Sequence, residues 1–576
     1  MNADFFDALR AGTERISVWA DLLDSINVFP VADGDTGRNL LISLLPLKSS
    51  VRDPGVLTEK LFMSARGNSG NIAAQFFTGF LSYGNIAQFT YAVQAGTRRA
   101  WHAIADPQPG TMLSVFDELE SALKESTANG AIDKEGAWIY GVLKRLEDTV
   151  LGTTNALTVL KNANVVDSGA LGMFIFFDAF MNTLYRRDPQ FAPISDIFKE
   201  QLTVRGSAAW NRESGDCVDA VVQFKNREQK SIETLATLGV SLVSHEYGDR
   251  VKIHIHTNEQ SQVRDVLSRD GSIIQWVSDD LGAQTMAFYS EPIRQAIHIV
   301  TDAAGSITRE QAKKLGITLL DSYITVGTKD APETYVDRTE LYQAMRKGIK
   351  VTTSQASTFE RHQHYEKVLN LYGTVLYLCV GSAFTGNYRV VMDWKKKHDP
   401  ENRLKVVDTG AASGRLGIIT TAVARYSLTA SSEEDVLDFA ARAVSTSEEY
   451  IFLDTLHFLA AGGRLSKTSA VFGDMLRLKP VVSPLNEGAK KVAVVRNKKD
   501  QIAFAIGKLG KAFHTDDHPL IMIEYTDNQS WIEKELLPLV QGMLPHAETT
   551  VHPFSLTSGV HMGPGTWGIA FLRYPS

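Results

Sequence analysis

The stretch NVFPVADGDTGRNLL, residues 27–41, places two carboxylates, Asp33 and Asp35, on either side of a glycine and ahead of an apolar run. On a helix, side chains two residues apart do not face each other, whereas a turn hinged at glycine lets both carboxylates face one point. Converging carboxylates suit Mg²⁺ or Ca²⁺, which prefer oxygen ligands. An EF-hand loop is excluded, because its glycine and glutamate positions hold an arginine and a leucine here. A surface turn with Thr36 as the N-cap of a helix is the alternative at this point.

The whole chain has the composition of a large globular protein. Its 576 residues are 44% hydrophobic and 22% charged, with a formal net charge of −7, and the length predicts about three or four domains. We see no basic run and expect no nucleic-acid partner; no apolar stretch of about 18 residues or more predicts a membrane span. The two cysteines, Cys217 and Cys379, are too few for a disulfide framework, and the N-terminus has no signal-peptide layout. We therefore expect a cytoplasmic protein.

Residue patterns change twice along the chain. Apolar residues at helical spacing fill residues 1–195, and β-branched segments such as CVDAVVQF and DRVKIHIHTN mark residues 205–290. Beyond them, strand-like and helical stretches alternate, as in α/β layering. The sequence thus predicts a multidomain chain with an all-α domain, a small α+β middle domain and an α/β domain. The predicted domain ranges are 1–197, 198–292 and 293–576.

Three small-residue motifs follow the acidic hairpin at junctions between helical segments. SARGNSGNI (64–72) predicts a short loop that exposes backbone N–H groups, which can cradle a phosphate. PGTML (109–113) and VVDSGALG (165–172) are two further turns of this kind. No P-loop motif is present, so P-loop nucleotide binding is excluded.

In their order and spacing, INVFPVADGDTG, ARGNSGN, PGTML and VVDSGALG resemble the L-subunit (DhaL) domain of dihydroxyacetone kinases. More closely, they resemble the kinase subunit of bacterial fatty acid kinase. The resemblance implies an all-helical barrel that binds ATP through Mg²⁺ ions on the first loop, with Asp33 and Asp35 as catalytic metal ligands. Arg38 replaces a usual threonine, and it either contacts phosphate or crowds the site. The nucleotide-binding residues that the resemblance implies are Asn27, Asn68, Ser69, Gly70, Thr111, Met112 and Asp167.

The middle segment carries a candidate zinc site. His254 and His256 are two residues apart on a predicted strand, so both rings lie on one face. Cys217 opens another predicted strand, and one cysteine with two histidines and an open position suits Zn²⁺. The alternative is a histidine pair on the polar face of a sheet with a buried, apolar Cys217. The segment resembles the central domain of the fatty acid kinase subunit, where the corresponding positions bind zinc.

The last 280 residues or so place polar turns beside apolar strands and helices, as in TTSQAS (352–357), GSAFTGNY (381–388), LAAGGRLS (459–466) and HMGPGTWG (561–568). Together these turns can gather hydroxyls, an arginine and a histidine to hold a carboxylate. Individually, such residues most often only form turns. The set resembles the DegV family of fatty-acid-binding proteins, which implies a two-lobed lipid-binding domain. The implied substrate-binding residues are Thr353, Ser354, Thr385, Arg464 and His561.

These patterns predict one polypeptide that joins a kinase to an acyl carrier. The predicted reaction transfers the γ-phosphoryl group of ATP to a fatty acid carboxylate and gives an acyl phosphate. One alternative is a small-molecule kinase of the dihydroxyacetone (glycerone) type, and another is a non-catalytic lipid carrier or sensor. The expected cofactors are ATP with Mg²⁺ and Zn²⁺. The expected partner is a fatty acid, with at most a transient membrane contact for lipid exchange, and the pattern leaves room for a homodimer.

Overall fold

A computed structural model describes residues 3–82, 88–128, 136–185, 190–204, 215–224, 230–288, 293–455, 457–461 and 479–574. The chain separates into two compact units, Met1–Glu291 and Pro292–Ser576. The division of the chain into three domains stays a prediction. Within the described ranges, none of the helices has the length and apolar character of a membrane span.

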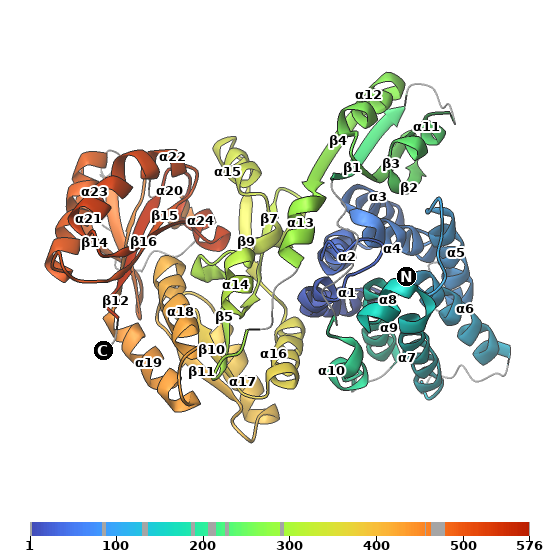
Figure 1. Cartoon of the computed structure of the whole chain (residues 1–576), viewed down its shortest axis with the longest axis horizontal. Coiled ribbons are helices and arrows are strands. Elements are labelled where there is room, and N and C mark those ends of the chain that lie inside the picture. Colours follow the sequence, from blue (N-terminus) through green and yellow to red (C-terminus); the bar gives the residue numbers. More distant parts are fainter. Residues whose placement is uncertain are drawn as a thin grey trace. The chain divides into compact units, whose positions relative to one another are not determined.

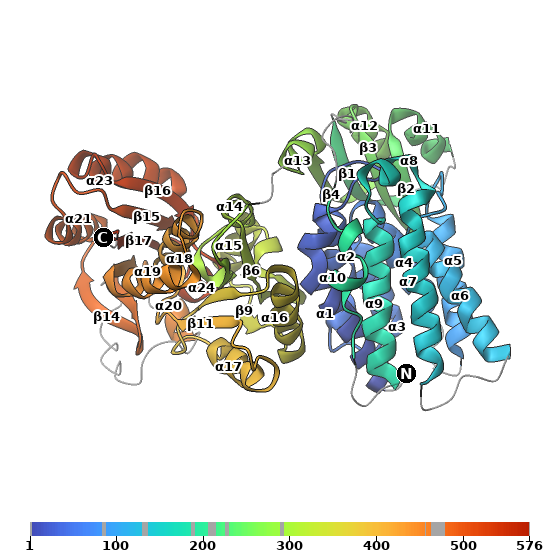
Figure 2. The same cartoon turned by 60° about the horizontal axis from the view of Figure 1, so that its bottom comes forward.

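A closed ring of helices forms the first part of unit 1 (Figure 1, blue to teal). Its helices are α1 (Ala3–Ser25), α2 (Thr36–Leu44), α3 (Pro54–Ser64), α4 (Gly67–Phe80), α5 (Phe89–His102), α6 (Met112–Ala128), α7 (Trp138–Ala156), α8 (Thr158–Ala163), α9 (Ser168–Tyr185) and α10 (Ile194–Ile197). The chain of contacts α1–α2–α4–α5–α6–α7–α9 returns to α1, so the ring closes. Figure 2 shows α7 beside α9 from a second direction. The predicted all-α barrel is confirmed.

Phenylalanine rings fill the centre of this barrel. Phe76 on α4 stacks on Phe116 of α6 with 4.1 Å between ring centroids, and Phe177 of α9 meets both rings edge-on. All three side chains are fully buried. Buried aromatic rings contribute large apolar areas, so this cluster holds the helices in place around the barrel axis.

A four-stranded antiparallel sheet follows in unit 1. Its elements are β1 (Asp216–Phe224), α11 (Lys230–Leu238), β2 (Val240–Tyr247), β3 (Arg250–Thr257), α12 (Gln260–Asp270), β4 (Gly271–Asp280) and α13 (Leu281–Phe288), and the strand order is β2-β3-β1-β4. Alternate residues such as Val218, Ile253 and Ile255 pack in an apolar cluster with residues of α11 and α12. The residues between them point to the opposite face because the side-chain period of a strand is two. That polar face lies towards α4, which contacts β2 and β3.

Unit 2 is an α/β structure, as predicted, and its described residues form three sheets. Its elements are β5 (His298–Asp302), α14 (Arg309–Leu315), β6 (Ile317–Leu320), β7 (Ser322–Val326), β8 (Lys329–Pro332), α15 (Arg338–Arg346), β9 (Val351–Gln355), α16 (Thr358–Tyr372), β10 (Val375–Cys379), α17 (Asn387–His398), β11 (Leu404–Asp408), α18 (Ser413–Ser427), α19 (Glu433–Thr446), β12 (Ser447–Phe452), α20 (His457–Ala461), β13 (Lys479–Leu485), β14 (Gly488–Val495), α21 (Lys498–Ala512), β15 (Leu520–Tyr525), α22 (Gln529–Trp531), α23 (Leu537–Met543), β16 (Glu548–Pro553), α24 (Leu556–Met562) and β17 (Trp567–Leu572). The sheets have the orders β11-β10-β5-β6, β14-β13-β12-β17-β15-β16 and β8-β7-β9. Helix α18 contacts β5 of the first sheet and β12, β15 and β17 of the second, and so joins the two sheets.

Two carboxyl groups are buried where α18 meets the six-stranded sheet. Glu449 on β12 and Glu524 on β15 flank β17, and both residues are 0% exposed. The Ser413 hydroxyl donates to Glu449 at 2.8 Å. Burial raises the pKa of both groups, and the charge of Glu449 raises the pKa of Glu524 further. This pair therefore favours a shared proton over two charges.

Candidate functional site

A cavity in unit 1 gathers the N-terminal ends of four helices. The first residues of α2, α4, α6 and α9 all line it; they are Thr36, Gly67, Met112 and Ser168. The first N–H groups of a helix have no partner within the helix, and the helix dipole adds a partial positive charge at this end. Four such ends around one space suit a polyanion such as a nucleotide phosphate chain.

The acidic hairpin forms one wall of this cavity. Asp33 is half-buried and Asp35 is buried, and both line the cavity. Between them Gly34 has a φ of 66°, which allows the reversal that brings both carboxylates to one side. The Asn27 amide donates to Asp33 and accepts from the Ser168 hydroxyl at 3.4 Å, so Asn27 holds the first carboxylate in place.

Helix α2 begins directly after the hairpin. The predicted N-cap, Thr36, is its first helical residue, and the cap position belongs to Asp35. The N–H groups of Gly37 and Arg38 donate instead to Asp24 on α1, at 2.7 and 3.1 Å. Asp35 therefore keeps its carboxylate for the cavity, because another side chain satisfies the helix end.

The electrostatics of the hairpin favour a bound cation. Burial raises the pKa of Asp33 well above its usual range, and the charge of Asp35 raises it further. Burial also raises the pKa of Asp35, although Arg38 acts in the opposite direction, and it raises the pKa of the nearby Asp24 to about 8. Two carboxylates that repel each other, one half-buried and one buried, fit a divalent ion with oxygen ligands, and Mg²⁺ is such an ion.

The predicted phosphate loop is shorter than the sequence suggested. Helix α4 already begins at Gly67, so Asn68 and Ser69 lie in its first turn, and both line the cavity. Gly70 serves a different purpose, because a Cβ there would lie 2.1 Å from the Ser43 hydroxyl on α2. It therefore allows α2 and α4 to pack closely, and it is not among the described residues that line the cavity.

The residues predicted to meet the nucleoside line the same cavity. Thr111 and Met112 stand at the start of α6, and Asp167 precedes α9. Asp167 caps α9 by accepting the Ala170 N–H at 2.7 Å. Burial raises the pKa of Asp167 to about 7. A carboxyl group near its midpoint at neutral pH can donate or accept a hydrogen bond to a base or ribose.

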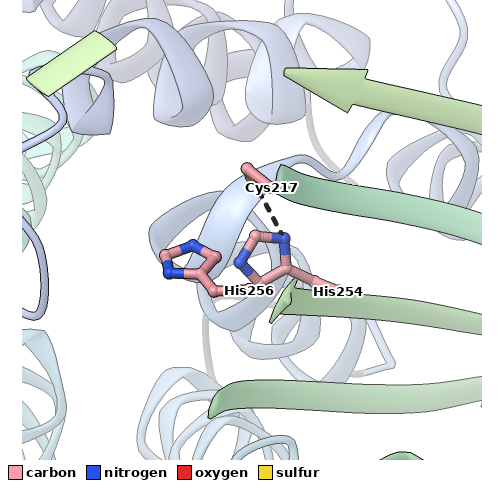
Figure 3. Close-up of side chains that lie close together, drawn as sticks. All are labelled: Cys217, His254 and His256. Carbon is pink, nitrogen blue, oxygen red and sulfur yellow. Dashed lines mark hydrogen bonds between the residues drawn. The ribbon is translucent and has the colours of Figure 1, made fainter. Parts of the chain in front are cut away.

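Cys217, His254 and His256 come together as predicted (Figure 3). Their ligand atoms lie within 4.8 Å of one another, and all three residues are buried. The Cys217 Sγ is 3.9 Å from His254 Nδ1, and the buried Nε2 of His254 has no hydrogen-bond partner among the described residues. A buried imidazole with one orphaned nitrogen, next to a thiol and a second imidazole, offers the donor set that suits a zinc ion.

The structure adds a relation that the sequence did not predict. Cys217, His254 and His256 line the same cavity as the acidic hairpin, whereas the sequence placed them in separate sites. Burial raises the pKa of the Cys217 thiol, and the carboxylates of Asp219 and the hairpin raise it further. The hairpin, the helix ends and the Cys–His cluster therefore form one composite site.

Arg38 does not face this cavity. Its guanidinium Nη2 lies 3.1 Å from Asp279 Oδ2 at the end of β4, and both side chains are partly exposed. It is absent from the described cavity wall. Arg38 thus ties α2 to the middle sheet, and its predicted contact with phosphate remains a prediction.

Sequence reasoning missed Asp219, which lies beside the composite site. It stands two residues after Cys217 on β1, pairs with His254 in the β1–β3 register, and is buried. Burial acts to raise its pKa, but the His254 ring, Lys252 and a hydrogen bond from the Gly67 N–H lower it below the usual range. The period of two along CVD was the signal that could have found it.

Unit 2 brings two of the predicted carboxylate-binding residues into contact. Thr353 Oγ1 on β9 is 3.0 Å from His561 Nε2 on α24. Ser354 is exposed beside Thr353. The Thr385 hydroxyl accepts the Asn387 N–H at 3.2 Å ahead of α17. Arg464 lies outside the described residues.

Three family models match the chain in succession. Residues 30–182 match the DAK2 domain, residues 213–288 match the FakA-like (fatty acid kinase) middle domain, and residues 296–574 match the DegV family of uncharacterised proteins. The chain therefore joins a DAK2 domain, a FakA-like middle domain and a DegV domain. The first two models indicate a kinase-type family.

Individual relatives and solved structures resemble parts of this chain at 22–30% sequence identity. Uncharacterized proteins of Staphylococcus aureus strains USA300 and NCTC 8325 are 30% identical over 352 residues, which cover 54% of this chain. The match spans 63% of the length of those relatives. A fatty-acid-binding DegV protein of Thermus thermophilus is 23% identical and covers 49% of this chain and 100% of its own, with a TM-score of 0.45. DegV of Bacillus subtilis, described as a fatty acid binding protein, is 22% identical with the same coverage and TM-score.

Proposed function

We propose that this chain is an ATP-dependent phosphotransferase that forms an acyl phosphate from a fatty acid. The observation that carries the proposal is the composite cavity, where four helix N-termini face the carboxylates of Asp33 and Asp35. That combination fits a triphosphate with its metal ions. The match to the FakA-like middle domain, a fatty acid kinase module, favours a fatty acid as the acceptor.

The reaction requires neutralisation of the phosphate charge, and it does not require a general base. A carboxylate has a pKa of about 4–5 and is ionised at neutral pH, so no proton has to leave the acceptor. The difficulty is the approach of an anion to a polyanion. The N–H groups at the start of α4, around Asn68 and Ser69, are placed to hold phosphate oxygens. Bound to Asp33 and Asp35, Mg²⁺ would neutralise phosphate charge and orient the γ-phosphoryl group.

The Cys217–His254–His256 cluster would hold zinc at the edge of the same cavity. Three protein ligands would leave a fourth position of a zinc ion open to another ligand. The cluster fixes the ends of β1 and β3 against the cavity, since a single ion would join both strands. We therefore assign the zinc a role in shaping the nucleotide site.

We assign the binding of the fatty acid to unit 2. Thr353 and His561 share a contact of 3.0 Å, and together they offer a hydroxyl and a ring nitrogen to a carboxylate. Carrying the acceptor on the same polypeptide raises its effective concentration to about the mM scale when the geometry permits. Both cysteines are free, in keeping with the reducing cytoplasmic location that the sequence predicts.

The test is ATP-dependent acyl phosphate formation, trapped as a hydroxamate with hydroxylamine. Purified protein is incubated with Mg²⁺-ATP and oleate, and in parallel with dihydroxyacetone or no acceptor. Hydroxamate that forms only with oleate supports the proposal. ATP turnover only with dihydroxyacetone identifies a glycerone-type kinase, and fatty acid binding without turnover identifies a lipid carrier or sensor; either result rejects the proposed reaction.

A further inference from the structure

One buried carboxylate touches both the metal-ligand cluster and the first turn of α4. Asp219 Oδ2 accepts the Gly67 N–H at 3.1 Å, and Oδ1 accepts the Asn71 side-chain amide at 3.2 Å. The same Oδ1 lies 3.4 Å from His254 Nδ1. Asp219 is 5% exposed, and Asn71 and His254 are 0% exposed. The two contacts with α4 join residues that are about 150 positions apart in sequence.

The strand register explains why this carboxylate reaches both partners. In the β1–β3 ladder Cys217 pairs with His256, and Asp219 pairs with His254. Both β1 residues therefore face α4, with Asp219 one step further from the cavity. Asp219 is not among the described residues that line the cavity, so it acts through residues that do line it.

We propose that Asp219 is a positioning residue that couples metal binding by the Cys217–His254–His256 cluster to the binding of nucleotide phosphates at the start of α4. The inference rests on the proposed function, which assigns the metal and the nucleotide to this cavity. A carboxylate on Nδ1 favours the tautomer with a proton there, and that leaves Nε2 free as a ligand. The orphaned Nε2 of His254 matches this arrangement.

The coupling arises because the carboxylate of Asp219 contacts both His254 and α4. His254 would offer Nε2 as the ligand, and a cation held there would make the Nδ1–H group a stronger donor to Asp219. The fixed carboxylate then holds the Gly67 N–H in the first turn of α4 and the Asn71 amide one turn further on. Asn68 and Ser69 of the first turn line the cavity. Linkage requires the reciprocal effect, so bound nucleotide should also tighten metal binding.

The experiment measures binding, not turnover. ATP affinity is determined calorimetrically in Mg²⁺ buffer for zinc-loaded and zinc-stripped full-length protein, as wild type, Asp219→Asn and Asp249→Asn. Asp249 is a matched control, since it lies in the turn between β2 and β3 of the same sheet and, among the described residues, its side chain accepts the exposed Gln223 amide at 2.7 Å. Zinc affinity comes from competition with a chromogenic chelator. Hydrogen exchange of the peptide that covers the start of α4 reports on the helix end.

We expect stripping of zinc to weaken ATP binding about 5- to 150-fold in wild type and in Asp249→Asn. In Asp219→Asn, ATP affinity should no longer depend on zinc, and zinc affinity should fall about 10- to 100-fold. Coupling of wild-type size in Asp219→Asn overturns the proposal, and so does wild-type protein without coupling. Should Asp219→Asn fail to fold, Asn71→Ala removes one of the two contacts between Asp219 and α4, together with the bond from the Asn71 amide to the Gly67 carbonyl. It should keep zinc affinity and lose part of the coupling, and undiminished coupling there also overturns the proposal.

These outcomes are separate from those of the proposed reaction. Coupled binding of zinc and ATP without hydroxamate formation would support the role of Asp219 and reject the fatty acid kinase reaction. Protein that forms hydroxamate with oleate but shows no coupling does the reverse.

Discussion

Replacing Asp35 with asparagine should separate the chemistry of the acidic hairpin from its structural role. The change removes one formal charge and one candidate Mg²⁺ ligand while nearly keeping the side-chain size. Asparagine is as good an N-cap as aspartate, so α2 should begin at the same residue. Burial and the neighbouring charge of Asp35 raise the pKa of Asp33. Removing that charge relieves the repulsion, so the variant should be at least as stable as wild type.

The expected loss is in phosphoryl transfer. Loss of one metal ligand that contributes about 4 kcal/mol to the transition state lowers the rate roughly 10³-fold. Fatty acid binding should not change, because Thr353 and His561 belong to unit 2. A matched control is Asp53→Asn, since Asp53 is the N-cap of α3 and accepts the Val56 N–H at 2.9 Å away from the cavity. It should leave rate and stability close to wild type.

The assay combines hydroxamate trapping with oleate, calorimetric binding of ATP and of oleate, and thermal unfolding. The metal-site interpretation requires a large loss of rate with unchanged or higher stability. Turnover like wild type in Asp35→Asn would leave the hairpin as a turn and no more. A variant that loses activity and unfolds at a much lower temperature would also contradict the reasoning, because the cost of burying the Asp35 charge outweighs its attraction to Arg38.

Further predictions concern zinc, the acyl site and the buried carboxyl pair. Cys217→Ser should lower zinc content, measured by elemental analysis, and thermal stability together; unchanged zinc would reject the three-ligand site. His561→Ala should weaken oleate binding and hydroxamate formation at unchanged ATP affinity. Thr353→Val should do the same, since the two side chains are 3.0 Å apart. Oleate binding isotherms equal to that of wild type would reject the carboxylate site. The raised pKa of Glu524 means that the folded state holds a proton that the unfolded state releases above about pH 4.5. The contribution of this group to stability is therefore complete at low pH and lost as pH rises. Glu524→Gln should raise the melting temperature at pH 8 and not at pH 4. If the melting temperatures of variant and wild type changed in parallel with pH, the shared proton would be contradicted.

Local patterns predicted the elements of this protein well. The helical spacing within residues 1–195 corresponds to helices such as α5, Phe89–His102, and DRVKIHIHTN contains β3, Arg250–Thr257. The period of two in that strand placed His254 and His256 on one face, and their ligand atoms do gather with Cys217. These predictions succeeded because periodicity and turn residues act over a few positions, where the sequence contains all the interacting groups.

Two of the predicted site residues have neighbours that the motifs did not indicate. Gly70 was assigned to phosphate from its glycine-rich motif, but its neighbour is Ser43, a residue of another helix. Arg38 was assigned to the nucleotide, but its partner is Asp279, 241 positions later. A motif states which residues are close along the chain, and it does not state which face of an element meets which neighbour.

By itself the sequence determined the order of the helical, mixed and α/β parts, and the oxygen, sulfur and nitrogen ligands that each part offers. Only the tertiary structure decided that the hairpin carboxylates and the Cys217–His254–His256 cluster line one cavity. It also decided that Asp219 bridges His254 and the first turn of α4. The physical reason is that these contacts depend on how the polar face of the middle sheet packs against the barrel. That packing is set by the apolar faces of both parts together, and no local stretch of sequence contains it.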